Sequence, residues 1–102
     1  MNIFSIYLEK IKNFLVDLEK NKKIILSNNL NNLAIELTPK NLKGDISCNA
    51  ALILSKVNNK KPKDIAIQLK DSLLKKFPEF KNIFIAGIIS TLIIQVDRNY
   101  CS

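Results

Sequence analysis

Apolar residues recur at every third or fourth position near the start of the chain. Charged and amide residues fill the positions between them, which is the spacing of a helix with one buried face. The apolar positions are Ile3, Ile6, Tyr7, Ile11, Phe14, Leu15 and Leu18. This pattern predicts an amphipathic helix over residues 3–18.

A strand-like pattern follows at residues 33–37, where apolar residues alternate with Ala34 and Glu36. Alternation with a period of two is typical of a half-buried strand. The polar run 27–32 before it indicates a turn. Pro39 ends the strand or restricts it to a sheet edge, because proline has no N–H to donate to a neighbouring strand.

Two helices are predicted in the middle of the chain. Residues 50–57 form a short apolar helix that Asp45 or Ser47 can cap and that Asn58 and Asn59 end. Pro62 suits the first position of the next helix, since its missing N–H would be unpaired there. The predicted buried stripe of that helix is Ile65, Ala66, Leu69, Leu73 and Phe77.

Two strands are predicted at the C-terminal end, over residues 81–86 and 91–96. In the first, Ile83 and Ile85 share one face and Phe84 lies on the other. The uncharged stretch 83–96 is shorter than the ~18 apolar residues that a membrane-spanning helix needs, so no membrane span is expected.

The order of elements predicts an α+β fold. It runs helix, strand, a second short strand near Gly44, two helices and two strands. We expect a two-layer sandwich in which three helices cover one face of a small, mainly antiparallel sheet of about four strands. At 102 residues and 47% hydrophobic content, the chain suits a single domain, residues 1–102, with its own core.

The charge is strongly positive, with a formal net charge of +7. Such a balance favours an anionic partner through long-range attraction and counterion release. All basic residues except Arg98 are lysines. Lysine is a point charge rather than a planar bidentate donor, so any nucleic-acid recognition by these residues is expected to have low specificity.

Several chemistries lack their usual residues. The sequence contains no histidine, only two glycines and two distant cysteines, Cys48 and Cys101. Histidine-based triads, a glycine-rich phosphate loop and a zinc site are therefore not expected, and neither is a disulfide framework. No catalytic residue, metal site or cofactor is predicted. The first eleven residues lack the order of a signal peptide, which favours a cytoplasmic protein with reduced thiols.

Two segments carry candidate binding residues. Gly44, Asp45 and Asn49 admit two roles: glycine conformation with capping and local hydrogen bonding, or contact with an RNA phosphate at a helix N-terminus. Lysines flank the two predicted helix starts and form a phosphate-binding rim if those starts are adjacent, or a solvated face if they are not. The candidate rim is Lys40, Lys43, Lys60, Lys61 and Lys63.

Three short motifs in order resemble the N-terminal additional domain of bacterial arginyl-tRNA synthetases. The first has Gly44, Asp45, Asn49 and Ala51 in a Gly-Asp-x-x-x-Asn-x-Ala pattern. The second is an x-Pro-x-x-Ile-Ala pattern around Pro62, and the third is a strand ending in Ala-Gly at Gly87. The resemblance covers residues 1–87 and breaks in the tail, 88–102.

The resemblance implies the same two-layer fold and tRNA as partner. In the family, an aromatic residue and an asparagine after the Ala-Gly segment approach a D-loop base, and a separate core uses ATP to join arginine to tRNA. This chain has Ile88, Ile89 and Ser90 at the matching place and lacks the catalytic motifs of that core. The reader residues therefore cannot be carried over, and a truncated, non-catalytic tRNA-binding domain is expected.

An alternative from another class stays open. The tail still alternates as a strand, so the chain can be an interaction module or decayed fragment that associates through its terminal strand without specific RNA recognition. Its partner would be a catalytic chain in trans or a second copy at an exposed sheet edge.

Overall fold

The structure is a computed structural model, and it describes residues 3–26, 29–38 and 44–97 of the chain. Pro39, Lys40, Lys43, Arg98 and Cys101 lie outside the described residues. The helices are α1 (Ile3–Lys20), α2 (Ala50–Val57) and α3 (Pro62–Lys76), with a short 3-10 helix at Asn29–Asn32. The strands are β1 (Ile35–Leu37), β2 (Ile46–Cys48), β3 (Phe80–Ala86) and β4 (Thr91–Val96).

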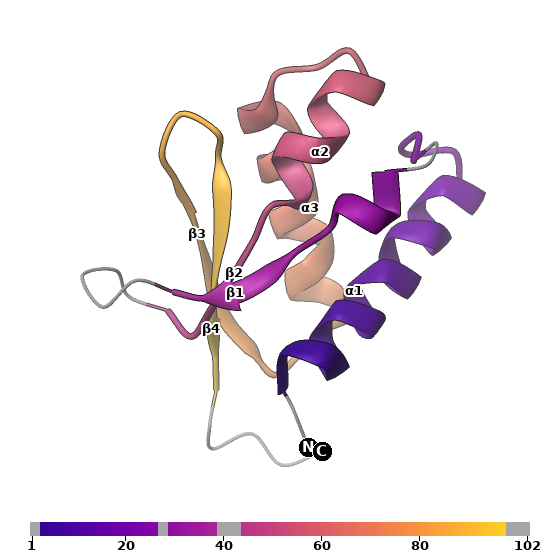
Figure 1. Cartoon of the computed structure of the whole chain (residues 1–102). Coiled ribbons are helices and arrows are strands. Elements are labelled where there is room, and N and C mark those ends of the chain that lie inside the picture. The colour runs from indigo at the N-terminus through magenta and orange to yellow at the C-terminus, as the bar shows by residue number, and fades with distance from the viewer. Residues whose placement is uncertain (1–2, 27–28, 39–43, 98–102) are drawn as a thin grey trace.

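The four strands form one sheet in the order β1-β2-β4-β3, and every neighbouring pair is antiparallel. Figure 1 shows the three helices on one side of this sheet and no helix on the other. The predicted α+β two-layer fold is confirmed. The predicted bounds of α2 and β4 are also confirmed, because each is a short, mainly apolar run with a polar residue on either side.

The core lies between the helices and the inner face of the sheet. Alternation along β4 directs Leu92 and Ile94 inward, where they are fully buried with Ile83 of β3. The helices contribute their predicted apolar stripes, including Ile11 of α1 and Leu69 of α3. Phe77 belongs to the predicted stripe but follows the last helical residue, and it stacks on Phe80 with ring centroids 4.9 Å apart.

Strand β4 lies inside the sheet, paired on both sides, although it belongs to the tail that departs from the family motif. Its outward residue Ile93 is aligned with Ser47 on one side and Phe84 on the other. Ile93 is only 3% exposed because Gly44 passes over it, and a Cβ at Gly44 would overlap its Cγ2 atom. The terminal strand therefore has no free edge, and the sheet ends at β1 and β3 within the described residues.

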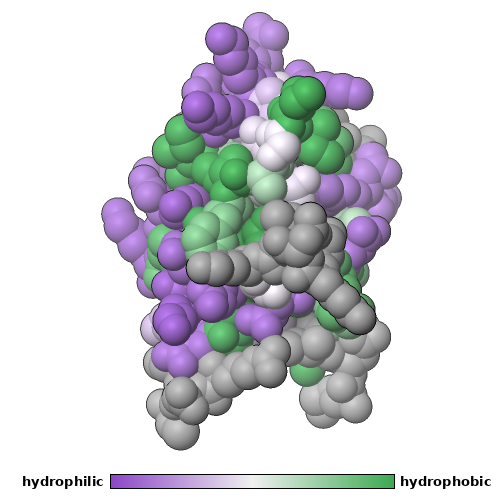
Figure 2. All heavy atoms as spheres, turned by 90° about the vertical axis from the view of Figure 1, so that its left-hand side faces the viewer, coloured by the Kyte–Doolittle hydropathy of each residue, from purple (hydrophilic) through white to green (hydrophobic). Residues whose placement is uncertain are grey.

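Figure 2 shows the open face of the sheet, with hydrophobic side chains near its centre and hydrophilic ones along its upper end. Leu37 is 73% exposed, and Ile89 and Phe84 are also exposed. Together with Ile93 and Ala86, Leu37 and Ile89 line a hollow of about 560 Å³. Glu36 is the charged residue in its lining, and the other lining residues are apolar or neutral.

Candidate nucleic-acid interface

Three of the five lysines of the predicted rim lie around the junction of α2 and α3, and the five-residue rim itself stays a prediction. Lys60 and Lys61 lie in the turn between the two helices, and Lys63 lies in the first turn of α3. Gly44, the described neighbour of Lys43, precedes β2 and therefore lies before the opposite end of α2. The structure groups three of the five predicted lysines, and the other two lie outside the described residues.

The α2–α3 turn has its shape because α2 ends in a Schellman motif. Asn59 takes a left-handed conformation with φ 52°. Its N–H donates to the Lys56 carbonyl at 3.3 Å, and the Lys60 N–H donates to the Ser55 carbonyl at 3.0 Å. Asparagine tolerates this conformation better than most residues with a side chain. The resulting turn surrounds a hollow of about 330 Å³ lined by Ser55, Lys56, Asn59, Lys60 and Lys61.

The same motif ends α1, and sequence reasoning missed it. Lys22 is left-handed with φ 60°, its N–H donates to the Glu19 carbonyl at 2.9 Å, and the Lys23 N–H donates to the Leu18 carbonyl at 2.9 Å. The motif leaves Lys20, Lys22 and Lys23 exposed. No glycine marks this helix end, so the usual sequence signal for the motif is missing here.

Asn58 joins the two helix ends. Its Oδ1 accepts a hydrogen bond from the Ile25 N–H at 2.8 Å, and its Nδ2 donates to the Ile25 carbonyl at 2.9 Å. Nδ2 also donates to the Leu54 carbonyl at 2.8 Å. One side chain thus holds the segment after α1 against the end of α2, 33 residues further along the chain.

This arrangement gathers exposed lysines at one end of the helical layer. We call it the lysine end and define it as Lys20, Lys22, Lys23, Lys56, Lys60, Lys61 and Lys63. The Glu19 carboxylate, which lies in the same region, accepts a hydrogen bond from the Leu26 N–H at 2.9 Å. An excess of exposed like charge on neighbouring segments favours a polyanion.

The Gly44 motif has a structural role that differs from the predicted one. The expectation that Asp45 or Ser47 caps α2 is wrong, because strand β2 occupies residues 46–48 and α2 begins after Asn49 without a side-chain cap. Asp45 Oδ2 instead accepts a hydrogen bond from the Val96 N–H at 2.8 Å. Ser47 Oγ donates to the Glu36 carbonyl at 3.4 Å, across the β1–β2 pair.

Asn49 also bonds at long range, not locally as expected. Its Oδ1 accepts from the Ala34 N–H at 2.8 Å, and its Nδ2 donates to the Asn32 carbonyl at 3.0 Å. The asparagine therefore fixes the segment that leads into β1. Gly44 is required because it lies too close to Ile93 for a side chain. Packing explains Gly44, and hydrogen bonds to the backbone explain Asn49.

Pro62 begins α3 at the predicted position, with Lys61 as the residue before it. Lys61 makes no side-chain capping bond. Asp64 in the first turn complements the positive end of the helix dipole. The start of α3 thus presents Lys61 and Lys63 outward.

The β3–β4 turn lies where the family motif breaks. Gly87 has φ 77°, Ser90 has φ 56°, and the Ser90 N–H donates to the Gly87 carbonyl at 3.2 Å. Ile88 at the tip is 99% exposed. Figure 1 shows this turn and the α2–α3 turn at the same, upper end of the molecule. A hydrocarbon side chain at the tip offers neither a ring for stacking nor an amide for hydrogen bonding.

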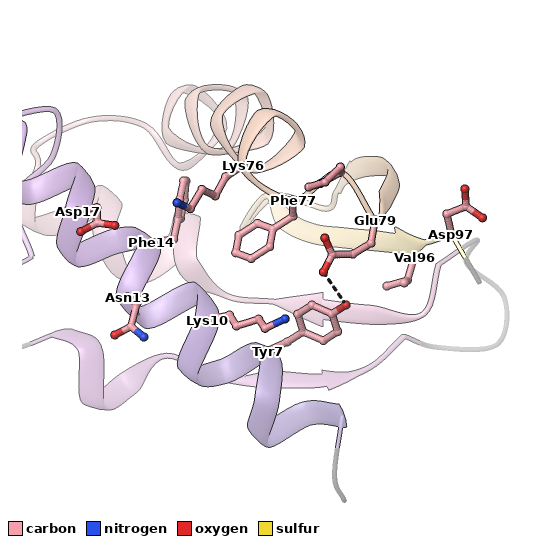
Figure 3. Close-up of a pocket in the computed structure, with 11 residues that line it drawn as sticks. Tyr7, Lys10, Asn13, Phe14, Asp17, Lys76, Phe77, Glu79, Val96 and Asp97 are labelled. Carbon is pink, nitrogen blue, oxygen red and sulfur yellow. Dashed lines mark hydrogen bonds between the residues drawn. The ribbon is translucent and has the colours of Figure 1, made fainter. Parts of the chain in front are cut away.

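A hollow of about 700 Å³ lies between α1 and the start of β3. Figure 3 shows Tyr7 from α1 directed at Glu79, and its hydroxyl donates to Glu79 Oε2 at 3.2 Å. Burial, and then the charge and hydrogen bond of Glu79, raise the pKa of Tyr7 above its ordinary value of 10.0. The hydroxyl therefore stays protonated at neutral pH and is not an activated nucleophile.

The described part of the chain also contains a cysteine thiol, which is not activated. Burial raises the pKa of the Cys48 thiol from 9.0 to about 12, so the nucleophilic thiolate is suppressed. Among the described residues, no three histidine, cysteine, aspartate or glutamate side chains gather as a metal site would require. Nor is any described helix long and apolar enough to cross a membrane.

The described residues thus form a small α+β domain with exposed lysines at one end of its helical layer. The family model for the arginyl tRNA synthetase N terminal domain matches residues 6–88. The chain belongs to this family. The matched residues include the segments that carry the three motifs, so the predicted family is confirmed.

A curated relative agrees with the family. An arginine–tRNA ligase of Pelagibacter ubique (strain HTCC1062) is 44% identical over 66 residues, which are 65% of this chain and 11% of the ligase. This chain therefore matches only a small part of the ligase's length. No solved structure matches the chain.

Proposed function

We propose that this chain is a tRNA-binding domain of the arginyl-tRNA synthetase type, and that it binds tRNA through the lysine end. Family membership supports the class of partner. The observation that carries the proposal is the Asn58 side chain, which holds the lysines after α1 beside those after α2. RNA presents a regular array of phosphates, and exposed ammonium groups on adjoining segments attract them.

In this proposal the chain contributes binding and not catalysis. The relative's name implies that arginine is joined to tRNA, and that chemistry, with its ATP, would depend on a catalytic core of the ligase type. Such a core, in the same protein or in a second chain, would be the protein partner. The setting would be the cytoplasm, where tRNA is charged.

Binding through lysines has a defined physical signature. Each phosphate contact releases condensed counterions, so the logarithm of the association constant falls with the logarithm of salt concentration by about 0.7 to 0.9 per contact. Phosphate contacts position an RNA without reading its bases. We therefore expect affinity that falls steeply with salt and discriminates weakly between tRNAs.

The test is titration of labelled arginine tRNA with the purified chain at several salt concentrations. In the variant Lys60→Glu/Lys61→Glu the affinity and the salt slope should both fall. The matched control Lys12→Glu/Lys81→Glu changes net charge equally at residues of α1 and β3 outside the lysine end. Binding that is independent of salt, or that falls equally in both variants, would contradict a localised lysine interface.

A second candidate function is an interaction module, favoured by the exposed apolar residues on the open face of the sheet. Because β4 is interior, a second copy or a catalytic chain would have to pair at β1 or β3. Sedimentation of the chain and of Leu37→Asp tests this candidate. Concentration-dependent association that the substitution abolishes supports it, and a monomer at all concentrations excludes self-association.

A further inference from the structure

A second basic surface lies between α1 and α3, and sequence reasoning did not single it out. It is a groove of about 610 Å³ that we call the α1–α3 groove. Its lining is Phe14, Asp17, Leu18, Lys20, Asn21, Lys23, Ser72, Lys75 and Lys76. Four of these nine residues are lysines, contributed by segments about fifty positions apart in the sequence.

The helical spacing explains how the lysines face one another. Lys75 and Lys76 follow Ser72 by three and four positions, so they share one face of α3. Lys20 ends α1, and the Schellman motif returns Lys23 toward the same side. Gln68 of α3 donates a hydrogen bond to the Lys23 carbonyl at 3.4 Å, which ties this segment to α3.

The charges of the groove are poorly balanced. Asp17 is its single carboxylate against four ammonium groups. In the residues that the structure describes, none of the four lysines has an ion-pair partner. Lys20 and the pair Lys75 and Lys76 lie in the last turns of α1 and α3, where a cation also stabilises the helix dipole. A test must therefore separate binding from helix stability.

The floor of the groove restricts what it can bind. Phe14 and Leu18 are buried, and the Phe14 ring contacts the Phe77 ring edge-on at 6.1 Å between centroids. Among the residues that line the groove, no aromatic face is therefore open for base stacking. The rim offers ammonium groups together with the neutral hydrogen-bonding groups of Asn21 and Ser72. Ammonium groups suit phosphate oxygens, and the neutral groups can bond to ribose hydroxyls.

We propose that the α1–α3 groove binds the ribose–phosphate backbone of RNA and continues the lysine end. Lys20 and Lys23 belong to both surfaces, so one strand can pass from the α2–α3 turn to α3 without leaving positive potential. This inference rests on the proposed RNA-binding function and adds the path that the backbone follows. It also assigns Lys75 and Lys76 as phosphate contacts of that path.

The experiment compares Lys75→Gln/Lys76→Gln with Lys60→Gln/Lys61→Gln and with the control Lys12→Gln/Lys81→Gln. Each pair loses the same charge, and glutamine is a good helix former. Labelled arginine tRNA and an unrelated tRNA are titrated at several salt concentrations. For the groove pair we expect a salt slope smaller by about 1.4 to 1.8 and roughly tenfold weaker binding, equal for both tRNAs. Lys75→Arg/Lys76→Arg should bind like the unchanged chain.

The outcomes separate the two proposals. If the groove pair binds like the control while the Lys60 and Lys61 pair binds weakly, the groove inference is wrong and the proposed function stands. If neither pair differs from the control, the RNA-binding function itself is wrong. Backbone contact is the wrong assignment if the groove pair loses affinity for one tRNA only. It is also wrong if the loss of affinity disappears once the affinity is corrected for the folded fraction, which thermal unfolding measures. The arginine pair controls for folding because it keeps the charge.

Discussion

Replacing Asn58 with alanine tests how the two lysine-bearing segments are joined. The substitution removes three hydrogen bonds, two to Ile25 and one to Leu54, with lengths of 2.8, 2.9 and 2.8 Å. It changes no charge and leaves every lysine in place. Its effects on stability and on RNA binding therefore report the junction itself.

The magnitude follows from the exposure of the three bonds. A hydrogen bond contributes about 0.5 to 1.5 kcal/mol net, and more is lost when a buried partner stays unpaired. The two bonds to Ile25 are exposed, so water replaces them in part, whereas the bond to Leu54 is partly buried. We expect Asn58→Ala to lower the free energy of unfolding by about 2 kcal/mol.

Urea unfolding followed by circular dichroism measures that loss, and hydrogen exchange of the Ile25 amide locates it. Protection of this amide should fall more than that of amides in β4. Asn13→Ala is the matched control, because Asn13 is an exposed asparagine of α1 and alanine is the better helix former. RNA affinity should also fall in Asn58→Ala and stay unchanged in Asn13→Ala.

Two results would refute this reasoning. The first is a stability change no larger than that of Asn13→Ala, with the protection of the Ile25 amide unchanged. The second is a destabilised variant that binds tRNA with undiminished affinity and salt slope. The first outcome would mean that the Asn58 hydrogen bonds do not stabilise the fold. The second would mean that they do not contribute to RNA binding.

Three further predictions concern single residues. Gly44→Ala should lower the free energy of unfolding in urea clearly more than Gly87→Ala does. Both glycines have positive φ, but only at Gly44 does an added Cβ meet Ile93, so equal losses would contradict the close approach. Lys22→Gly should raise the free energy of unfolding by about 1 kcal/mol, because glycine adopts the left-handed conformation of this position without a side-chain clash. A lower melting temperature would contradict this. The pKa of the Cys48 thiol is raised to about 12, so the unfolded chain loses this proton first and the free energy of unfolding should fall from pH 9 upward, by at most about 4 kcal/mol. The fall should be smaller in Cys48→Ala, where the raised pKa of Tyr7 still contributes, and an equal fall in both chains would contradict the prediction.

Periodicity predicted much of the fold because the relevant forces are local. The bounds of α2 and β4, the Pro62 helix start and the buried stripe of α3 follow from short apolar patterns and proline geometry. The position of β4 between β2 and β3 did not follow, because strand order depends on contacts between distant segments.

The polar side chains before α2 and the lysines also depend on contacts between distant segments, which local patterns do not predict. Asp45 and Asn49 have residue types that suit a helix cap, yet their side chains bond to backbone groups far away in the sequence. The lysine cluster in the α2–α3 turn was visible as a run, whereas its junction with Lys20, Lys22 and Lys23 depends on one asparagine side chain. Sequence reasoning found Lys60, Lys61 and Lys63 because they flank a predicted helix start, and it missed the others because no local signal brings them to that turn.

A map of backbone amide shifts in the isotopically labelled chain, recorded as arginine tRNA is added, locates the residues that contact RNA. The account predicts shifts clustered at residues 20–23, 56–63 and 72–76, which diminish as salt is raised. Shifts confined to the open face of the sheet and the β3–β4 turn, with the lysine segments unchanged, would contradict it.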